Sequence, residues 1–261
     1  MHADPWRPAQ YERFRDERER PGLDLLALVR SAPEMRAVDL GCGTGRLTRR
    51  LHAELHARET VGIDRSSRML ETALADPLPP GLTFDFTTIE SFAPRAGEYD
   101  LIFSNAAFHW IDDHEALLTR LAAALAPGGQ LAFQVPAMHD DLSHTVAEAL
   151  TDVDPFRRTF GGWHRPQPVL APEAYAELLQ RLGFAEQQVR LQVYPHVLDR
   201  PDEVVEWMKG TLLTDYQKRL APEQFPQFVE AYRARLLPQL GNTRPFFFPF
   251  RRILCWARKS A

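Results

Sequence analysis

Three glycines and two aspartates carry the clearest chemical signal in this sequence of 261 residues. Gly41, Gly43 and Gly45 stand at alternate positions directly after an apolar run that contains Asp39. Glycine accepts positive φ angles and lets a ligand lie against bare backbone, and the helical pattern that follows points its N–H groups at that ligand. The turn alone is equally compatible with an ordinary connection between a strand and a helix.

Asp64 makes a nucleoside the favoured ligand of this turn. It ends a second apolar run about 20 residues after the glycines, where a carboxylate can accept hydrogen bonds from both ribose hydroxyls. A dinucleotide fingerprint needs glycine at its sixth position, which is Arg46 here, and the Gly-Lys-Ser/Thr ending of a P-loop is absent. The sequence therefore predicts a nucleoside cofactor at the glycine turn.

The elements that must position these residues alternate between strands and helices. The patterns predict strands over 36–40, 60–64, 82–86, 99–104 and 130–135, with helices over 46–56, 67–75 (capped by Ser66) and 113–125. This alternation indicates a doubly wound, mostly parallel α/β sheet, whose ligands bind at the carboxyl ends of the strands. A charged helix over 5–20 is expected to stop at Pro21-Gly22, and Pro127-Gly128-Gly129 predicts a turn.

Composition disfavours several classes of partner. Lysine and arginine number 31 against 35 acidic residues, a net charge of 31 − 35 = −4, whereas nucleic-acid binders are usually basic. Cys42 and Cys255 form no CxxC pair, so no disulfide framework is expected and a cytoplasmic location is predicted. No signal peptide and no apolar run of the ~20 residues that span a membrane are apparent. No metal site is expected, because His52 and His56 lack a third ligand and residues 139–144 are better interpreted as a polar loop and helix start.

The motif Asp39-x-Gly41-x-Gly43-x-Gly45 resembles motif I of the S-adenosylmethionine-dependent methyltransferases. The resemblance implies that the glycine backbone lies along the methionine part of S-adenosylmethionine, with Asp39 near its amino group and Asp64 on its ribose. It further implies a cofactor-binding set that includes Arg65, Met69, Thr88, Ile89, Ser104 and Asn105. Many members carry an aspartate near position 88 for the adenine amino group, so here a hydroxyl or backbone group must replace it.

The turn after the fourth strand, Ser104 to Trp110, is expected near the positively charged sulfonium of that cofactor. Aromatic and carbonyl groups stabilise such a charge, which makes Asn105, His109 and Trp110 candidates. A histidine at this position is equally well explained as a general base or as a packing residue.

Four further segments resemble the trans-aconitate 2-methyltransferase family: Trp6 to Pro21, Phe103 to Trp110, Glu206 to Tyr216 and Phe247 to Leu254. This resemblance implies a class I, Rossmann-like, seven-stranded sheet with a late antiparallel strand and a helical cap. Residues 21–136, 171–194 and 244–261 would form the cofactor-binding core, and residues 1–20, 137–170 and 195–243 the cap. The expected partner is a small tricarboxylate, with no nucleic acid and no membrane, and the expected state is a monomer or weak homo-oligomer.

A carboxylate is already ionised at neutral pH, because its reference pKa is about 4. It can therefore accept a methyl group without a base. Cations and hydroxyls in the cap should hold the acid, since arginine forks match carboxylates. The candidates are Arg18, Arg20, Trp110, His164, Arg165, Lys209, Thr211, Tyr216, Arg251 and Arg252, with Lys209, Tyr216 and Arg251 expected first and Tyr216 also a catalytic candidate. Three alternatives stay open: another small acid or a carrier-bound malonyl ester as substrate, a cofactor-binding protein without transfer activity, and, more distantly, a nicotinamide-dependent reductase.

Overall fold

The computed structural model describes the backbone of residues 15–261 and the side chains from Glu19 onward. Contacts within the chain divide it into two units. The first contains the described residues up to Pro136, Pro168–Gln192 and Arg252–Ala261, and the second contains Ala137–Gln167 and Val193–Arg251. This division differs from the predicted segments at residues 15–20, 168–170, 193–194 and 244–251, and a cap function for the second unit stays a prediction.

The described residues contain one seven-stranded sheet in the order β3-β2-β1-β4-β5-β7-β6. Its strands are β1 (Arg36–Leu40), β2 (Glu59–Asp64), β3 (Leu82–Phe86), β4 (Tyr99–Asn105), β5 (Leu125–Pro136), β6 (Phe184–Leu198) and β7 (Phe246–Lys259). The neighbouring strands from β3 to β5 pair in parallel, and β7 is antiparallel to β5. The predicted fold class, including the late antiparallel strand, is confirmed.

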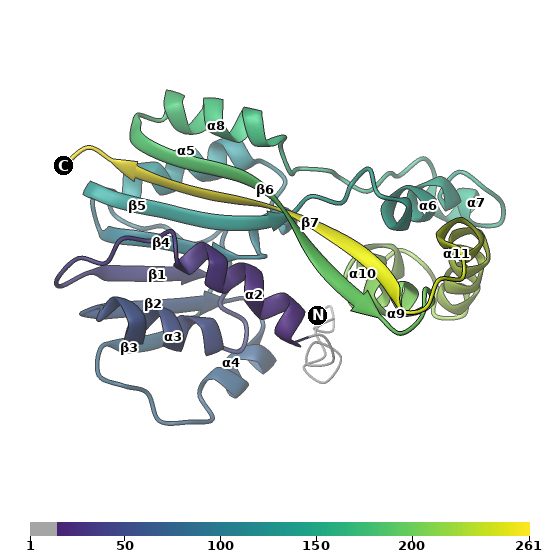
Figure 1. Ribbon diagram of the computed structural model, residues 1–261, viewed down its shortest axis with the longest axis horizontal. Helices are drawn as coiled ribbons and strands as arrows, with labels where there is room; N and C mark the ends of the chain where they lie inside the picture. The colour runs from purple at the N-terminus through teal and green to yellow at the C-terminus, as the bar shows by residue number, and fades with distance from the viewer. Residues whose placement is uncertain (1–14) are drawn as a thin grey trace. The chain divides into compact units, whose positions relative to one another are not determined.

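Burial explains why the central strands form where they do. The apolar residues of β1 and β4, Val38, Leu40, Leu101, Ile102 and Phe103, are fully buried, as expected for strands covered on both faces. Helices α2 (Arg15–Leu26) and α3 (Arg46–Leu55) lie on one face of the sheet and α5 (His114–Ala124) and α8 (Pro172–Arg181) on the other (Figure 1).

Side-chain caps set two helix starts in the first unit. The Ser66 hydroxyl accepts from the Met69 N–H at 3.2 Å and begins α4 (Ser67–Ala73), as predicted. Asp113 accepts from the Ala116 N–H at 2.9 Å and begins α5. Both strand-to-helix connections are therefore local features of the sequence.

The predicted helix stop at Pro21-Gly22 is wrong, because α2 continues through both residues to Leu26. Both residues are buried, and a Cβ on Gly22 would lie 2.5 Å from Leu47 Cδ2 and 3.1 Å from Asn105 Cγ. Glycine therefore serves here for close packing against α3 and β4. Tertiary packing outweighs the local preference of these residues for a helix end.

The predicted turn at Pro127-Gly128-Gly129 lies inside β5. Tyr99 pairs with Leu125, but Leu101 pairs with Gln130, so the intervening residues of β5 form an irregularity in the ladder. A bulge accommodates residues that a regular ladder would exclude. The strand therefore begins five residues earlier than the sequence predicts.

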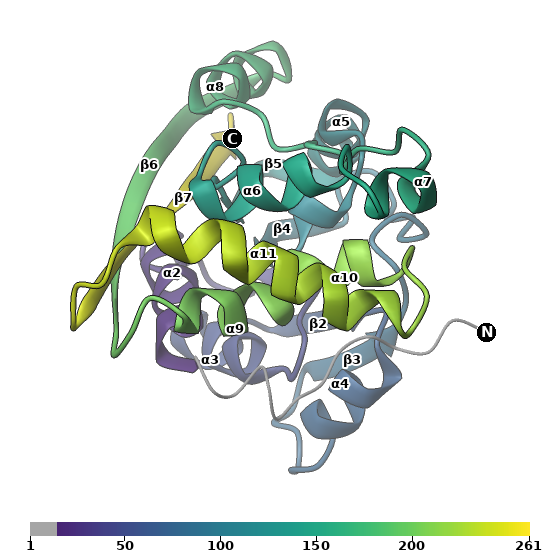
Figure 2. The same ribbon diagram turned by 90° about the vertical axis from the view of Figure 1, so that its right-hand side faces the viewer.

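The second unit contains α6 (Leu142–Leu150), α7 (Phe156–Phe160), α9 (Glu203–Lys209), α10 (Leu213–Gln217) and α11 (Gln224–Leu240), together with the parts of β6 and β7 that leave the first unit. Helix α11 runs beside α6 (Figure 2) and buries Phe228, Tyr232 and Leu236. Phe160 and Tyr216 lie 5.8 Å and 5.3 Å, between ring centroids, from Phe228. The Tyr232 hydroxyl donates to the Ser143 carbonyl at 2.8 Å, so this unit has an aromatic core of its own.

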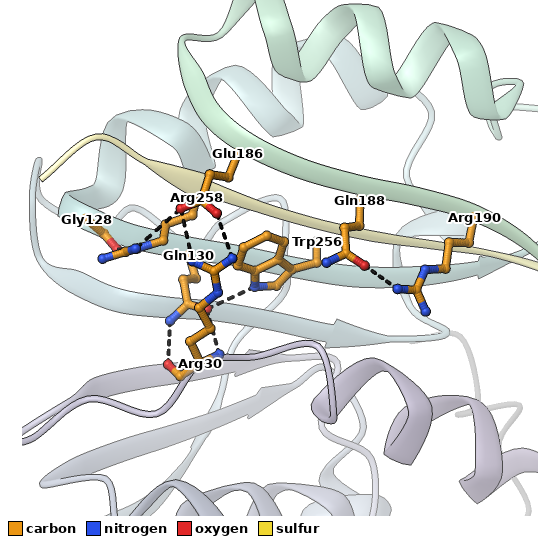
Figure 3. Close-up of polar contacts among 8 residues, drawn as sticks. All are labelled: Arg30, Gly128, Gln130, Glu186, Gln188, Arg190, Trp256 and Arg258. Atoms are coloured by element: carbon orange, nitrogen blue, oxygen red, sulfur yellow. Dashed lines mark hydrogen bonds and ion pairs between the residues drawn. The ribbon is translucent and has the colours of Figure 1, made fainter.

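Gln130 ties three segments of the first unit together (Figure 3). Its Oε1 accepts from the Arg30 backbone N–H and from Trp256 Nε1, both at 2.9 Å, and its Nε2 donates to the Arg30 carbonyl at 2.7 Å. Gln130 is 3% exposed, so water cannot replace these partners. The loop after α2 is thereby fixed to β5 and β7.

We expect Gln130→Ala to lower the free energy of unfolding by about 1–2 kcal/mol, because it leaves buried donors unpaired. Urea unfolding measures the change. Gln188→Ala is the matched control, since its side-chain oxygen accepts a hydrogen bond from the exposed Arg190 (Figure 3), and it should change stability by less than about 0.5 kcal/mol. An equal loss of unfolding free energy in the two variants would contradict the role of Gln130 as the buried link between the three segments.

Candidate active site

The glycine turn joins β1 to α3 at the carboxyl edge of the sheet. Gly41, Gly43 and Gly45 have φ angles of 78°, 55° and 72°, all in the left-handed region that favours glycine. The N–H groups of Gly41 and Cys42 both donate to the Ile63 carbonyl at 2.9 Å. The turn is thus fixed against the end of β2.

The three glycines serve different purposes. A Cβ on Gly41 would lie 2.3 Å from Ala107 Cβ, and a Cβ on Gly45 would lie 2.5 Å from Phe84 Cζ, so both permit close packing. A Cβ on Gly43 would meet nothing within 4 Å, and Gly43 lines a pocket. Gly43 is therefore the glycine at which a ligand can lie against bare backbone.

Asp64, the last residue of β2, is held by two backbone donors. The Gly43 N–H donates to its Oδ2 and the Ser66 N–H to its Oδ1, each at 2.8 Å. A carboxylate has about four lone-pair sites, so it can accept further hydrogen bonds from a ligand. Asp64 lines the same pocket as Gly43, which is the arrangement that a ribose diol requires.

Many of the predicted cofactor-binding residues line this one pocket together. Its wall includes Gly41, Gly43, Asp64, Arg65, Met69, Ile89 and Asn105 from that set, together with Trp110. It also includes Thr87, Glu90, Ala106, Ala107 and Ile111, which the sequence analysis did not single out. These five flank predicted residues in strand-end loops, so their proximity to a motif is the signal that could have found them.

The other predicted cofactor residues lie outside the wall. Thr88 Oγ1 bonds to Ser91 Oγ at 2.6 Å and shapes the loop after β3. The buried Ser104 donates to the Leu40 carbonyl at 2.8 Å and ties β4 to β1. Gly45 is the residue before the first turn of α3. These contacts shape the pocket from behind it.

Asp39 lies buried at 2% exposure beneath the turn. Its Oδ2 accepts from Thr48 Oγ1 at 2.6 Å, whereas its buried Oδ1 has no hydrogen-bond partner among the described residues. Burial raises the pKa of Asp39 to about 7, with a smaller contribution from the negative charge of Asp64. An unpaired buried carboxylate oxygen is the feature that a cationic ligand group would satisfy.

The turn after β4 is held in a strained form. Ala106 has a φ of +55°, which is uncommon for a residue other than glycine, and its N–H donates to the Gln134 carbonyl at 3.0 Å. Gln134 Nε2 also donates to Asn105 Oδ1 at 2.6 Å. The rings of His109 and Trp110 lie 4.7 Å apart between centroids and are tilted by 42°, and of the two only Trp110 belongs to the pocket wall.

The substrate candidates of the second unit form ion pairs and hydrogen bonds within it. The Tyr216 hydroxyl donates to Glu148 Oε2 at 2.8 Å, and His164 Nδ1 lies 2.9 Å from Glu148 Oε1. Lys209 Nζ lies 3.0 Å from Glu206 Oε2. Glu148 was not among the predicted residues, because the pattern around a single glutamate in a helix does not indicate a binding site. The side chain of Arg18 lies outside the described side chains.

Arg251 forms a two-pronged ion pair with Asp140, with Nη1 3.1 Å from Oδ2. Hydrogen bonding from Arg251 lowers the pKa of Asp140, so the pair stays charged at neutral pH. Burial, with the positive charges of Arg165, His139 and Arg251, lowers the pKa of His144 to about 3. Burial is the larger cause of this shift, and the nearby positive charges act in the same direction.

Metal ligands do not gather within the described part of the chain: no three His, Cys, Asp or Glu side chains there could hold an ion. His52, weighed above as a ligand, lies 2.9 Å from Thr60 Oγ1 and 3.2 Å from the Pro80 carbonyl. A search of the described helices finds none with the length and apolar character needed to cross a membrane.

Comparisons with known proteins agree with the site. The methyltransferase domain family matches residues 11–189. Trans-aconitate 2-methyltransferase of Deinococcus radiodurans is 41% identical over 254 residues, covering 95% of this chain and 96% of that protein. The enzyme of that name from Streptomyces avermitilis is 38% identical, covering 98% and 97%.

Solved structures show the same fold at low identity. The YcgJ protein from Bacillus subtilis has a TM-score of 0.61 and 17% identity, covering 93% of this chain and 99% of its own. A putative S-adenosylmethionine-dependent methyltransferase from Listeria monocytogenes has a TM-score of 0.54 and 18% identity, covering 92% and 100%. The predicted family and enzyme class are confirmed, and the chain belongs to the trans-aconitate 2-methyltransferase family of methyltransferases.

Proposed function

We propose that this chain transfers a methyl group from S-adenosylmethionine to one carboxylate of trans-aconitate, forming a monomethyl ester. S-adenosylmethionine is the methyl donor, and it supplies a methyl group bound to a positively charged sulfur. The observation that carries the proposal is the pocket that joins the open backbone of Gly43 to the Asp64 carboxylate, in a chain 41% identical to a trans-aconitate 2-methyltransferase.

The residues present fit this donor. Asp64 accepts from the ribose hydroxyls while the Gly43 and Ser66 N–H groups hold its carboxylate in place. Ile89, Met69 and Thr87 offer a mostly apolar surface for the adenine. The unpaired Asp39 Oδ1 is the acceptor for the amino group, because an ammonium offsets the cost of its burial.

Methylation of the acid requires alignment of the two reacting atoms more than it requires proton transfer. Its carboxylate is ionised at neutral pH, so His109 is not required as a base and serves through its contact with the Trp110 ring. Trp110 and Ile111 exclude water from the pocket, and Asn105 contributes an amide fixed by Gln134. The chain accelerates the reaction by holding the oxygen and the methyl carbon in line.

Cations and hydroxyls of the second unit bind the acid's other carboxylates. Arg251, Lys209, His164 and Tyr216 are the residues assigned to this task, with Arg251 first because its fork matches a carboxylate. Arg251 already binds the Asp140 carboxylate through two nitrogens, which supports its suitability for a planar anion. Arg18 completes the set. The cytoplasmic location and the monomeric or weakly oligomeric state stay predictions.

An assay with methyl-labelled S-adenosylmethionine tests the proposal. The protein is incubated with trans-aconitate, cis-aconitate, citrate, isocitrate or a malonyl carrier ester, and label is counted in an ester cleaved by mild alkali. Label on trans-aconitate above all other acids supports the assignment. Label on a different acid would replace the substrate, and tight S-adenosylhomocysteine binding without turnover on any acid would indicate a cofactor-binding protein.

We expect Arg251→Ala to raise the KM for trans-aconitate about tenfold, the cost of one charge-assisted contact, with the KM for S-adenosylmethionine within about twofold of wild type. Steady-state kinetics with each substrate varied in turn measure both constants. Arg158→Ala is the control, since Arg158 is 87% exposed and pairs only with Asp154 in the described structure. A larger rise for the donor than for the acid would remove Arg251 from the substrate site.

Cofactor affinity should also depend on pH through Asp39. Burial raises the pKa of this carboxyl to about 7, so below pH 7 it is protonated in the protein without ligand and binds an ammonium poorly. Affinity for S-adenosylhomocysteine should therefore rise about fivefold to tenfold between pH 6 and pH 7.5. Calorimetry measures it, and Asp39→Asn should flatten the dependence. The same slope in both proteins would assign the titration to another group.

A further inference from the structure

His114, the first residue of α5, joins the pocket turn to a distant helix of the first unit. It is 3% exposed. Its Nε2 lies 2.9 Å from the Phe108 carbonyl oxygen, and its Nδ1 lies 2.5 Å from the Tyr175 hydroxyl on α8. The Leu170 N–H points at the same hydroxyl at 3.3 Å.

These partners determine where the protons lie. A carbonyl oxygen only accepts, so Nε2 carries the hydrogen and donates to Phe108. Nδ1 is then an acceptor, so the Tyr175 O–H donates to it while the same oxygen accepts from Leu170. Burial lowers the pKa of His114 below its ordinary value, which agrees with a neutral ring. The two ring nitrogens of His114 therefore have opposite roles, Nε2–H as a donor and Nδ1 as an acceptor.

The Phe108 carbonyl belongs to the turn that forms one wall of the pocket. Phe108 begins the short 3-10 helix η1 (Phe108–Trp110), and Ala106, Ala107, Trp110 and Ile111 line the pocket around it. The turn is strained at Ala106, where φ is +55°. Such strain persists only when neighbouring contacts over-determine the backbone.

Two residues, Gln134 and His114, hold this turn through three hydrogen bonds. Gln134 fixes its start through the Ala106 N–H at 3.0 Å and Asn105 Oδ1 at 2.6 Å. His114 fixes its end through the Phe108 carbonyl. Gln134 lies on β5 and Tyr175 on α8, so the turn is anchored to two separate elements of the first unit.

We propose that His114 is a positioning residue for the methyl donor: its Nε2–H, oriented by Tyr175, holds the Phe108 carbonyl and thereby sets the pocket wall formed by Ala106, Ala107, Trp110 and Ile111. The inference rests on the proposed function, since it takes the donor to occupy this pocket. His114 acts through the turn and does not contact the reacting atoms. The competing account is a core histidine whose only role is packing, beside the Tyr175 ring at 5.7 Å.

Two substitutions of His114 separate these accounts. A glutamine amide reaches about as far as Nε2, so His114→Gln can still donate to Phe108 and loses the contact with Tyr175. An asparagine amide reaches only about as far as Nδ1, so His114→Asn keeps a partner for Tyr175 and loses the Phe108 contact. Both remove the imidazole from the core, so both should lower the melting temperature by a similar amount.

We expect the KM for S-adenosylmethionine and the Kd for S-adenosylhomocysteine to rise about tenfold in His114→Asn and less than about threefold in His114→Gln, since one hydrogen bond is worth about a factor of ten. The KM for the acid at saturating donor should stay within about twofold of wild type in both. Tyr175→Phe should lie between the two variants, because it removes the group that orients the ring.

Kinetics, calorimetry and thermal unfolding of the full chain give these values. Equal donor constants in His114→Asn and His114→Gln, or constants that follow the melting temperature alone, would overturn the proposal in favour of packing. Calorimetry on the wild type distinguishes a failure of the proposed function from a failure of this inference. If wild type fails to bind S-adenosylhomocysteine, the proposed function fails; if it binds and His114→Asn binds equally well, only this inference fails.

Discussion

Gly43→Leu should lower the affinity for S-adenosylhomocysteine at least about 100-fold, an effective loss of binding worth about 2.7 kcal/mol or more. A Cβ at this position meets no protein atom within 4 Å, and Gly43 lines the pocket. The added side chain therefore begins in the space that the donor needs, and its Cβ meets no protein atom. The Gly43 N–H also donates to Asp64, so the substitution lies beside the carboxylate that is proposed to bind the ribose.

The fold should survive this substitution with a modest loss. A side chain in the left-handed region costs about 1–2 kcal/mol, and the φ of Gly43 is +55°. Gly183→Leu is the matched control, because Gly183 has a φ of +82°, is exposed, and likewise has no atom within 4 Å of a Cβ. Both variants should lose similar stability by thermal unfolding, and only Gly43→Leu should lose binding by calorimetry. Wild-type affinity in Gly43→Leu would move the donor to another place.

Asp64→Ala should weaken S-adenosylhomocysteine binding about 100-fold, since hydrogen bonds to a charged group contribute about 1.5–3 kcal/mol. The carboxylate has two tasks, because it accepts from the Gly43 and Ser66 N–H groups at 2.8 Å and also faces the pocket. Its removal deprives the ribose of an acceptor and releases the glycine turn. Asp64→Asn should have an intermediate effect, because it preserves the shape and one acceptor oxygen.

A ligand without one ribose hydroxyl separates these two tasks. Wild type should bind adenosine more tightly than 2′-deoxyadenosine, and Asp64→Ala should bind the two alike. Asp85→Ala is the control, because Asp85 is an exposed acid on β3, paired in register with Ile63 beside Asp64, and lies outside the pocket wall. Retained discrimination between the two nucleosides in Asp64→Ala would show that another residue contacts the ribose.

The features that sequence reasoning predicted well are those with a local physical cause. The glycine turn follows from positive φ angles within five residues, and the start of α4 follows from the Ser66 cap. The buried apolar residues of β1 and β4 indicate central strands, because strands covered on both faces of a parallel sheet are rich in such residues. Asp64 was found because strand-end geometry places a carboxylate at a fixed distance from the glycines.

The features it missed depend on partners far away in the chain. Pro21-Gly22 continues a helix because Gly22 packs on Leu47 and Asn105, and no pattern around residue 22 encodes that contact. Thr88 was expected in the pocket, but a turn with Ser91 directs its hydroxyl elsewhere, and the neighbouring Thr87 lines the wall. The direction in which a loop side chain points depends on the hydrogen bonds of the loop, which the spacing of residues in the sequence does not reveal.

By itself, the sequence determined the parallel sheet, the family and the donor-binding turn, because short-range periodicity, glycine conformation and motif spacing act within a few tens of residues. Only the tertiary structure decided which side chains work together: Tyr216 with Glu148, Arg251 with Asp140, and His114 with Tyr175 are 68, 111 and 61 residues apart. Contacts of this kind arise when separate elements pack. Their energies depend on the burial and orientation that the folded chain creates, which no local pattern contains.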